Sequence, residues 1–442
     1  MVKMREKIIS FLMALALVAC VCCSFADSAD PADERVLILK ELRLYNTAGE
    51  DIFLPKVSYT YTVAGVQMAD SGNTVTDSAG TGSRVYSGVD EALTASSYTV
   101  EFSPDVTLLY DKDGALKTAV QPLKADRDGT SWYGGFTVGV NASAFEHPGI
   151  YRYKITEASA GRAAAGTDAL NAGLYSSERY LDIYVRRAGG TDDAVRTAAG
   201  HVVYGYVLFE KDPDAAEERV TANGLGNNTV KTSGFTGETG ADRYNTFNLT
   251  ISKTVRGDLA DTTNDFPVEA VLTNSELPGL AAQIGWRKNN GETETASFEN
   301  GRLVLGALTD RRAKFTIRDR DTLTVVGLPA GTTASVREYN NTFDVYESEI
   351  TVQAMTAAES RISLMQSKTA SAAVENVDNA TTVQTPGTAN SAVQFVNELK
   401  VISPTGYVVR ILPFMLIAAF SLLLLVFFFH RKRKEGEESD EI

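Results

Sequence analysis

Hydrophobic and polar residues alternate along many short segments of this chain. The alternation is clearest over residues 57–63, 151–156, 249–255 and 322–326, which are rich in Val, Thr and Tyr. A period of two places successive side chains on opposite faces of a β-strand, one face buried and one in solvent. Glycine, aspartate and asparagine separate the segments, as turns require. Between the two ends of the chain no segment shows a sustained helical period, so we predict an all-β fold made of β-sandwiches.

A weak internal repeat divides the chain into two units. A hydrophobic segment opens the first unit at residues 37–42, and a similar segment opens the second at 249–255. We therefore expect two tandem β-sandwich domains, over residues 27–247 and 248–400, each long enough to bury a core. The Ala-, Ser- and Thr-rich segment 354–376 departs from the alternation, and we expect either a long loop or a short helix there.

The C-terminal end carries an apolar segment of a different kind. Residues 411–429 are uncharged, and a helix of this length reaches about 28 Å, close to the hydrocarbon thickness of a bilayer. The basic run 431–434 follows, and such a run favours the cytoplasmic side. We therefore expect a transmembrane helix within 407–430 and a charged cytoplasmic tail over 431–442, with the bulk of the chain outside the cell.

The N-terminal end has the form of a secretory signal peptide. Three cations precede an apolar stretch, and Ser24-Phe25-Ala26 offers small residues at the positions that signal peptidase reads. We expect cleavage of residues 1–26 and a mature chain that starts at Asp27. A second reading stays open, because Leu17-Val18-Ala19-Cys20 has the form of a lipobox that would acylate Cys20.

Composition narrows the range of functions. All three cysteines lie in the signal segment, so the mature chain would have neither a disulfide nor a thiol nucleophile. The net charge is −14, and because residues 1–26 carry +2 and residues 406–442 carry none, the part between them carries −16. This acidity argues against nucleic acid or anionic lipid as a partner. No cofactor site, metal site or enzymatic nucleophile–base set stands out, and Asp111-Lys112-Asp113-Gly114 fits a hairpin turn better than a calcium loop.

Four residues stand directly before the apolar segment, namely Ser403, Pro404, Thr405 and Gly406. With Ile402 they resemble a variant of the Leu-Pro-x-Thr-Gly sorting signal of Gram-positive surface proteins, which a sortase cuts between threonine and glycine. The proline kinks such a substrate, and the glycine lets the enzyme approach the carbonyl. The resemblance implies that the membrane segment is temporary and that Thr405 becomes joined to another subunit or to peptidoglycan. A permanent single-pass anchor is the alternative.

Each unit also repeats a pair of charged residues. A lysine lies in the first segment of each unit, Lys40 in one and Lys253 in the other. A glutamate ends a late segment, Glu157 in Tyr-Arg-Tyr-Lys-Ile-Thr-Glu and Glu338 in Ala-Ser-Val-Arg-Glu. Together with Asn397 in Phe-Val-Asn, they resemble the hallmarks of the pilin isopeptide-linkage domains of streptococcal-type backbone pilins. Those domains are immunoglobulin-like sandwiches of the collagen-adhesin B type, and the resemblance covers nearly the whole ectodomain.

The resemblance implies an internal Lys–Asn or Lys–Asp amide bond in each unit, with the glutamate as its catalytic residue. In the second unit the acceptor would be Asn397, and ammonia would leave. In the first unit Asp242 stands where the family has asparagine, so water would leave, and Asn245 is the alternative acceptor. A lysine amine attacks only when neutral, and burial favours the neutral forms of both lysine and glutamate. Aromatic neighbours such as Tyr151 and Tyr153 are expected to keep such a site dry.

These features favour a pilin-like structural protein on a Gram-positive cell surface, and not an enzyme that acts on other molecules. Its partners would be a sortase, then other pilin subunits or peptidoglycan, with the membrane as a partner only before sorting. A backbone pilin needs a lysine that accepts Thr405 of the next subunit, and Lys211 is our candidate. A wall-anchored adhesin that binds a host ligand through loops in 158–241 stays open as an alternative.

Overall fold

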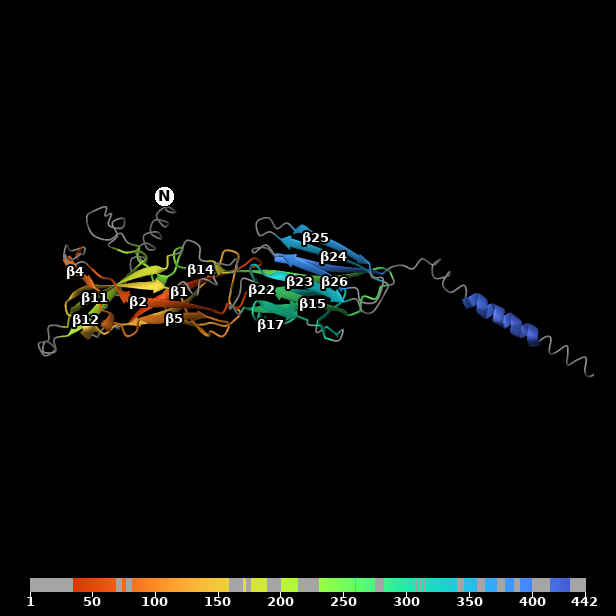
Figure 1. Cartoon of the computed structure of the whole chain (residues 1–442), viewed down its shortest axis with the longest axis horizontal. Coiled ribbons are helices and arrows are strands. Elements are labelled where there is room, and N and C mark those ends of the chain that lie inside the picture. Colours follow the sequence, from red (N-terminus) through yellow and green to blue (C-terminus); the bar gives the residue numbers. More distant parts are fainter. Residues whose placement is uncertain are drawn as a thin grey trace, which may run out of the picture.

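The computed structural model describes most of the region between the two ends of the chain. It describes residues 35–68, 74–76, 82–158, 170–171, 176–188, 200–213, 230–258, 260–274, 282–306, 308–309, 312–313, 315–339, 346–355, 362–371, 378–384, 390–399 and 414–429. The predicted signal peptide, the sorting motif and the charged tail lie outside these residues. The described region is built almost wholly of β-strands, as Figure 1 shows, so the all-β prediction is confirmed.

The first unit is a sandwich of two sheets. Its first sheet contains β1 (Arg35–Asn46), β6 (Leu108–Tyr110), β7 (Leu116–Thr118), β8 (Thr130–Gly139), β10 (Leu170–Asn171), β13 (Gly234–Phe235) and the start of β14 (Asp242–Arg256). Its second sheet contains β2 (Val57–Gly65), β3 (Thr74–Thr76), β4 (Gly82–Ser87), β5 (Ser97–Phe102), β9 (Gly149–Glu157), β11 (Glu178–Arg187) and β12 (His201–Phe209). Two 3₁₀ turns, η1 (Asp90–Ala92) and η2 (Ala142–Ala144), lie in the connections. The alternation of β2 is fully expressed, because every second residue from Val57 to Val63 is buried in the shared core.

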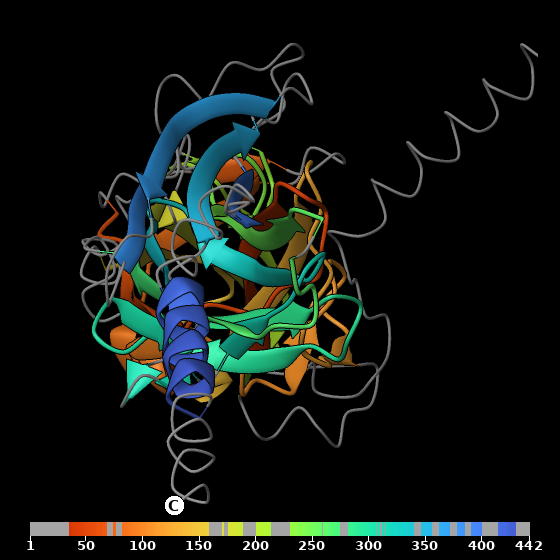
Figure 2. The same cartoon turned by 90° about the vertical axis from the view of Figure 1, so that its right-hand side faces the viewer.

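The second unit repeats the two-layer arrangement. Its first sheet contains the rest of β14 with β16 (Gln283–Lys288), β17 (Glu294–Ser297), β22 (Thr322–Pro329), β24 (Tyr346–Met355), β25 (Ile362–Ser371) and β27 (Asn390–Leu399). Its second sheet contains β15 (Phe266–Thr273), β18 (Arg302–Leu305), β21 (Phe315–Ile317), β23 (Thr333–Tyr339) and β26 (Asp378–Gln384). A small hairpin of β19 (Leu308–Thr309) and β20 (Arg312–Ala313) stands apart from both sheets. Figure 2 looks along the long axis of the molecule, with the second unit in front of the first.

One strand, β14, belongs to both units. Its first part runs parallel to β1, from Leu42 opposite Asp242 to Asn46 opposite Thr246. Its second part runs parallel to β27, where Leu249 faces Ser391. The predicted boundary between residues 247 and 248 therefore falls inside a continuous strand. The two sandwiches lie end to end along it (Figure 1).

One prediction about local structure changes. The segment 354–376, for which we expected a loop or a short helix, contains the strand β25, which pairs antiparallel with β24. Backbone pairing with an extended neighbour outweighs the weak pattern of its small polar residues.

Near the C-terminus, residues 414–429 form a helix whose residues are all exposed. Within the described part of the chain, no helix combines the length and the apolar character needed to cross a membrane.

Candidate functional site

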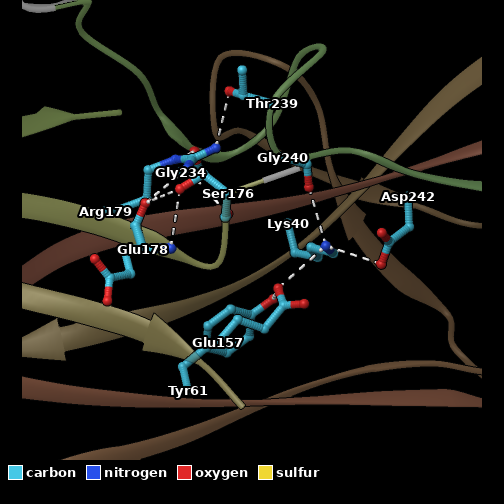
Figure 3. A network of polar contacts seen from close by, with 10 residues as sticks. All are labelled: Lys40, Tyr61, Glu157, Ser176, Glu178, Arg179, Gly234, Thr239, Gly240 and Asp242. Carbon is cyan, nitrogen blue, oxygen red and sulfur yellow. Dashed lines mark hydrogen bonds and ion pairs between the residues drawn. The ribbon is translucent and has the colours of Figure 1, made fainter. Parts of the chain in front are cut away.

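Lys40, Glu157 and Asp242 meet in the core of the first unit (Figure 3). Lys40 has the same parity on β1 as the buried residues Ile38 and Leu42, so its side chain enters the core. Its Nζ lies 3.2 Å from Oε2 of Glu157 and 3.1 Å from Oδ2 of Asp242. All three side chains are essentially excluded from solvent. The structure thus brings together the three residues predicted for this unit, from three different strands.

Aromatic rings enclose this first site. The hydroxyl of Tyr61 donates a hydrogen bond to Oε2 of Glu157 at 2.9 Å. The ring of Tyr61 lies against Phe136 and Phe235, at centroid distances of 4.8 and 4.9 Å. The ring of Tyr59 lies 4.4 Å from the Lys40 ammonium. Burial of ionised groups in such a core costs several kcal/mol per ion, so the site favours any reaction that removes charge.

Lys253, Glu338 and Asn397 form the corresponding site of the second unit. The Lys253 Nζ donates to both carboxylate oxygens of Glu338, at 2.8 and 2.7 Å. The Asn397 Nδ2 donates to Oε1 of the same glutamate at 2.7 Å. The Oδ1 of Asn397 is buried and has no hydrogen-bond partner among the described residues. The amide carbon of Asn397 is thus held beside the lysine by a shared glutamate.

Burial sets the protonation of the Lys253 amine. Desolvation lowers the pKa of Lys253 to about 8, although the charge of Glu338 acts in the opposite direction. The Nζ also lies 3.9 Å above the ring of Phe266, an apolar neighbour that excludes water. Near pH 7 this amine is therefore still mostly protonated, but its neutral, nucleophilic fraction is far larger than that of an ordinary lysine.

The two sites occupy the same place in the two sandwiches. In each unit, the acceptor lies on a strand that runs parallel to the strand of the lysine. It faces the residue two positions after the lysine. Leu42 faces Asp242 in the first unit, and Val255 faces Asn397 in the second. This matched register links two pairs of strands that are far apart in the sequence.

The glutamates also occupy equivalent positions. Glu157 lies opposite Tyr61 on β2, and Glu338 lies opposite Val268 on β15. Two residues before each of these partners stands the aromatic ring that covers the lysine, Tyr59 or Phe266. The second site has valine where the first has the Tyr61 hydroxyl, so the first glutamate receives a hydrogen bond that this position does not supply in the second.

Sequence reasoning missed the residues that enclose the sites. Tyr59 and Tyr61 lie in the alternating segment 57–63, whose pattern marks them as core residues but not as neighbours of Lys40. The rings we expected there serve other contacts, because the hydroxyls of Tyr151 and Tyr153 bond to His147 and Val89. Long-range packing decides which core aromatic touches which lysine, and alternation does not report it.

The other predicted residues fall into three groups. Asn245, the alternative acceptor, lies three positions after Asp242, so strand alternation directs its side chain to the other face of the sheet. Lys211 is exposed directly after β12. Ser403, Pro404, Thr405 and Gly406 lie outside the described residues.

The segment around Asp111 forms the predicted hairpin turn. The Asp111 Oδ1 accepts hydrogen bonds from the main-chain N–H groups of Asp113 and Ala115, between β6 and β7. Among the described residues, no group of three or more His, Cys, Asp or Glu side chains could hold a metal ion.

The second unit matches a protein-family model. Residues 247–398 match the model of a domain of unknown function, DUF7601. A 93-residue part of the chain is 36% identical to the pilus tip adhesin Cpa of Streptococcus pyogenes. The match covers 21% of this chain and only 12% of that relative.

Two solved pilus proteins align with most of this chain, but with low TM-scores. The major pilin of Streptococcus pyogenes aligns with 82% of this chain and 98% of its own, at 15% identity and a TM-score of 0.40. The pilus-presented adhesin Cpa aligns with 83% of this chain and 98% of its own, at 13% identity and a TM-score of 0.24. TM-scores this low carry no argument about function. The sequence similarity to Cpa concerns only the 93-residue segment.

Proposed function

We propose that this chain is a pilin-like structural protein of a Gram-positive cell surface, and that it stabilises itself with two internal amide crosslinks. The observation that carries the proposal is the pair of buried lysine, glutamate and acceptor sets in matched register. A lone buried ion pair is usually structural. Here two buried lysine–glutamate pairs each have an acceptor at the same position, which calls for one explanation that covers both. Crosslinking provides one, because it converts a costly buried charge into a neutral amide.

In the second unit the bond would join Lys253 Nζ to Cγ of Asn397. The neutral amine attacks the amide carbon. Glu338, which accepts hydrogen bonds from both the amine and Nδ2, takes a proton from the attacking amine and delivers one to the departing nitrogen. The Cγ–Nδ2 bond breaks and ammonia leaves with one proton taken from the lysine. The Glu338 carboxyl ends in the state in which it began. Strand pairing holds amine and amide together, which supplies the high effective concentration that such a reaction needs.

In the first unit the bond would join Lys40 Nζ to Cγ of Asp242. The ion pair of an ammonium and a carboxylate becomes an amide and one water molecule, so net charge is conserved. Two protons of the ammonium leave with the departing oxygen, and Glu157 transfers them. The 3.1 Å separation of Nζ and Oδ2 places the amine beside the carboxyl group that it would attack.

Both bonds would stabilise the chain strongly. Each would close a loop of well over 100 residues, for which the chain-entropy relation gives about 5 kcal/mol. Both would also meet on β14, since Asp242 and Lys253 lie on that one strand. A pulling force could then pass from β1 through β14 to β27 along covalent bonds, and bypass most of each sandwich.

Surface display is the second part of the proposal. The run Ser403, Pro404, Thr405 and Gly406, followed by uncharged residues and a basic end, supports sorting by a sortase after a temporary stay in the membrane. The 36% identity to a protein named pilus tip adhesin supports a place in a pilus or on the wall. The sortase would join Thr405 to peptidoglycan or to a lysine of the next subunit, for which exposed Lys211 is the candidate.

An adhesive role is the second candidate function, because the relative with 36% identity is named an adhesin. The loops of 158–241 would carry it, and they lie largely outside the described residues. A permanent membrane anchor is the remaining alternative.

The experiment is a comparison of wall extracts from the parent strain, a sortase-null strain and a Thr405→Ala strain. A high-molecular-weight ladder in the parent alone supports a backbone pilin. A single wall-bound band in the parent supports the adhesin. Membrane-bound protein of one size in all three strains would contradict sorting. Lys211→Arg, which keeps the charge, should abolish the ladder if Lys211 is the acceptor.

A further inference from the structure

The Lys40 amine has a third neighbour that comes from a loop. Its Nζ donates to the main-chain carbonyl of Gly240 at 3.1 Å, beside its contacts with Glu157 and Asp242 (Figure 3). Gly240 lies between β13 and β14, and β13 pairs with β1 directly at Lys40. The loop therefore brings a main-chain acceptor to the lysine.

Arg179 holds this loop in place. Its side chain is fully buried on β11, and its guanidinium donates to the carbonyl of Gly234 at 2.9 Å and to Oγ1 of Thr239 at 3.3 Å. It also donates to the carbonyl of Glu178 at 2.8 Å and of Ser176 at 3.3 Å. One guanidinium thus ties both ends of the segment 234–239 to the start of β11.

The packing at Gly240 is too close for any larger residue. A Cβ at this position would lie 2.6 Å from Arg179 Nη2 and 2.5 Å from the main chain of Phe235. The close approach lets the Gly240 carbonyl reach the lysine while the guanidinium lies behind the loop.

The three neighbours have a stereochemical consequence for the neutral amine. A neutral lysine has two N–H bonds and one lone pair in a tetrahedral arrangement. If Glu157 and the Gly240 carbonyl each accept one N–H, the lone pair points toward the third neighbour, the carboxyl group of Asp242. Attack on Cγ needs the lone pair in that direction.

We propose, on the basis of the proposed crosslink, that the Gly240 carbonyl orients the Lys40 lone pair toward Asp242, and that Arg179 is the positioning residue that holds it there. The bond made and the water lost are those of the proposed reaction; the loop takes no proton and is unchanged by it. The Lys253 amine is held differently, since its two hydrogen bonds to described residues both go to the one carboxylate of Glu338. Because Arg179 belongs to the first unit, the rate of the second crosslink is an internal reference within the same chain.

The test follows both crosslinks in the same full-length chain. The chain is made by cell-free translation with mild detergent, quenched at intervals and digested, and the Lys40–Asp242 and Lys253–Asn397 peptides are quantified by mass spectrometry. Arg179→Met should slow the first link by about tenfold, the factor expected for one lost hydrogen bond, and leave the second unchanged. Arg179→Lys, which can keep a contact with the loop, should recover part of the rate. Gly240→Ala, which displaces the carbonyl, should slow the first link as well.

Arg152 provides the matched control. It is an equally buried arginine of the same unit, but its guanidinium pairs with Asp182 through two 2.7 Å hydrogen bonds. Arg152→Met removes a buried ion pair and destabilises the unit, and it should slow the first link less than Arg179→Met does.

Equal slowing by Arg152→Met and Arg179→Met would reduce Arg179 to a structural residue and overturn the proposal. An unchanged rate in Arg179→Met or in Gly240→Ala would also overturn it. A wild-type chain without any Lys40–Asp242 link would contradict the proposed crosslink itself, and this inference with it.

Discussion

At the scale of single residues, two effects on the pKa of the buried Lys253 amine oppose each other. Desolvation favours the neutral amine, while the neighbouring carboxylate favours the ammonium. For Lys253 desolvation is the larger effect, and the pKa falls to about 8. An amide bond would remove the conflict, because it leaves no charge on the nitrogen. Glu338 has both a lysine and an asparagine within hydrogen-bond distance, which suits a proton carrier between them.

Glu338→Gln is expected to abolish the second crosslink. Glutamine cannot exchange protons between the amine and the leaving group, and loss of such a group typically costs at least about 100-fold in rate. Peptide mapping should then recover Lys253 and Asn397 in separate peptides. Glu398→Gln, at the exposed position next to Asn397, is the control and should leave the link intact. A normal link in Glu338→Gln would remove the catalytic role of this glutamate.

Crosslinking of the second unit should accelerate with pH. Below the folded pKa of about 8 the Lys253 amine is mostly protonated, so its neutral fraction rises about tenfold per pH unit and then levels above that value. The measurement uses freshly translated chain that is denatured before it reacts, refolded at several pH values and mapped with time. A rate that falls from about pH 6 to pH 8 would have the wrong sign for attack by a neutral lysine.

At the scale of elements, the arrangement depends on β14 and its parallel neighbours. Asp242 and Lys253 lie eleven positions apart on this strand, so they leave it on opposite faces, each toward its own core. A buried amide network supports the strand where the units meet. The Asn248 Oδ1 accepts from Asn46 at 2.9 Å and from the main chain of Gly327 at 3.2 Å.

Asn248→Ala should loosen this junction. It leaves the amide of Asn46 and the N–H of Gly327 without this acceptor, which should lower the free energy of unfolding by about 1–3 kcal/mol. Thr250→Ala, at a half-buried position on the same strand, is the control and should change it by no more than about 0.5 kcal/mol. Urea unfolding of the three proteins gives the comparison, and equal midpoints for all of them would show that the network is not stabilising.

Alternation predicted many elements correctly, but not their neighbours. The segments 57–63, 151–156 and 249–255 lie in the strands β2, β9 and β14, because alternate residues of each enter a core. The alternation along β1 also indicates that the Lys40 side chain faces a core. Its pairing with Glu157, 117 residues away, came from a family resemblance and not from any local pattern.

Arg179 and Gly240 show why the remaining residues around the first site could not be predicted from the sequence. Both lie in the region 158–241, and their roles depend on contacts between β11 and a distant loop. The strand β25 was missed for a similar reason, since pairing with β24 decides its conformation. Local sequence does not specify such long-range contacts.

At the scale of the whole molecule, two sandwiches form one elongated body on a shared strand (Figure 1). The part between the two ends carries a charge of −16, which keeps such bodies soluble and mutually repelling. Stability without disulfides must then come from the two cores and from the proposed bonds. The second of these bonds would end at Asn397, eight residues before the predicted sorting point at Thr405.

The most direct test is the intact mass of the predicted mature protein, residues 27–405, with peptide mapping. The account predicts a mass about 35 Da below that of the sequence, from the loss of one water and one ammonia. Asp242→Ala should restore about 18 Da of it and Asn397→Ala about 17 Da. A wild-type mass equal to that of the sequence would contradict the central claim that both units crosslink themselves.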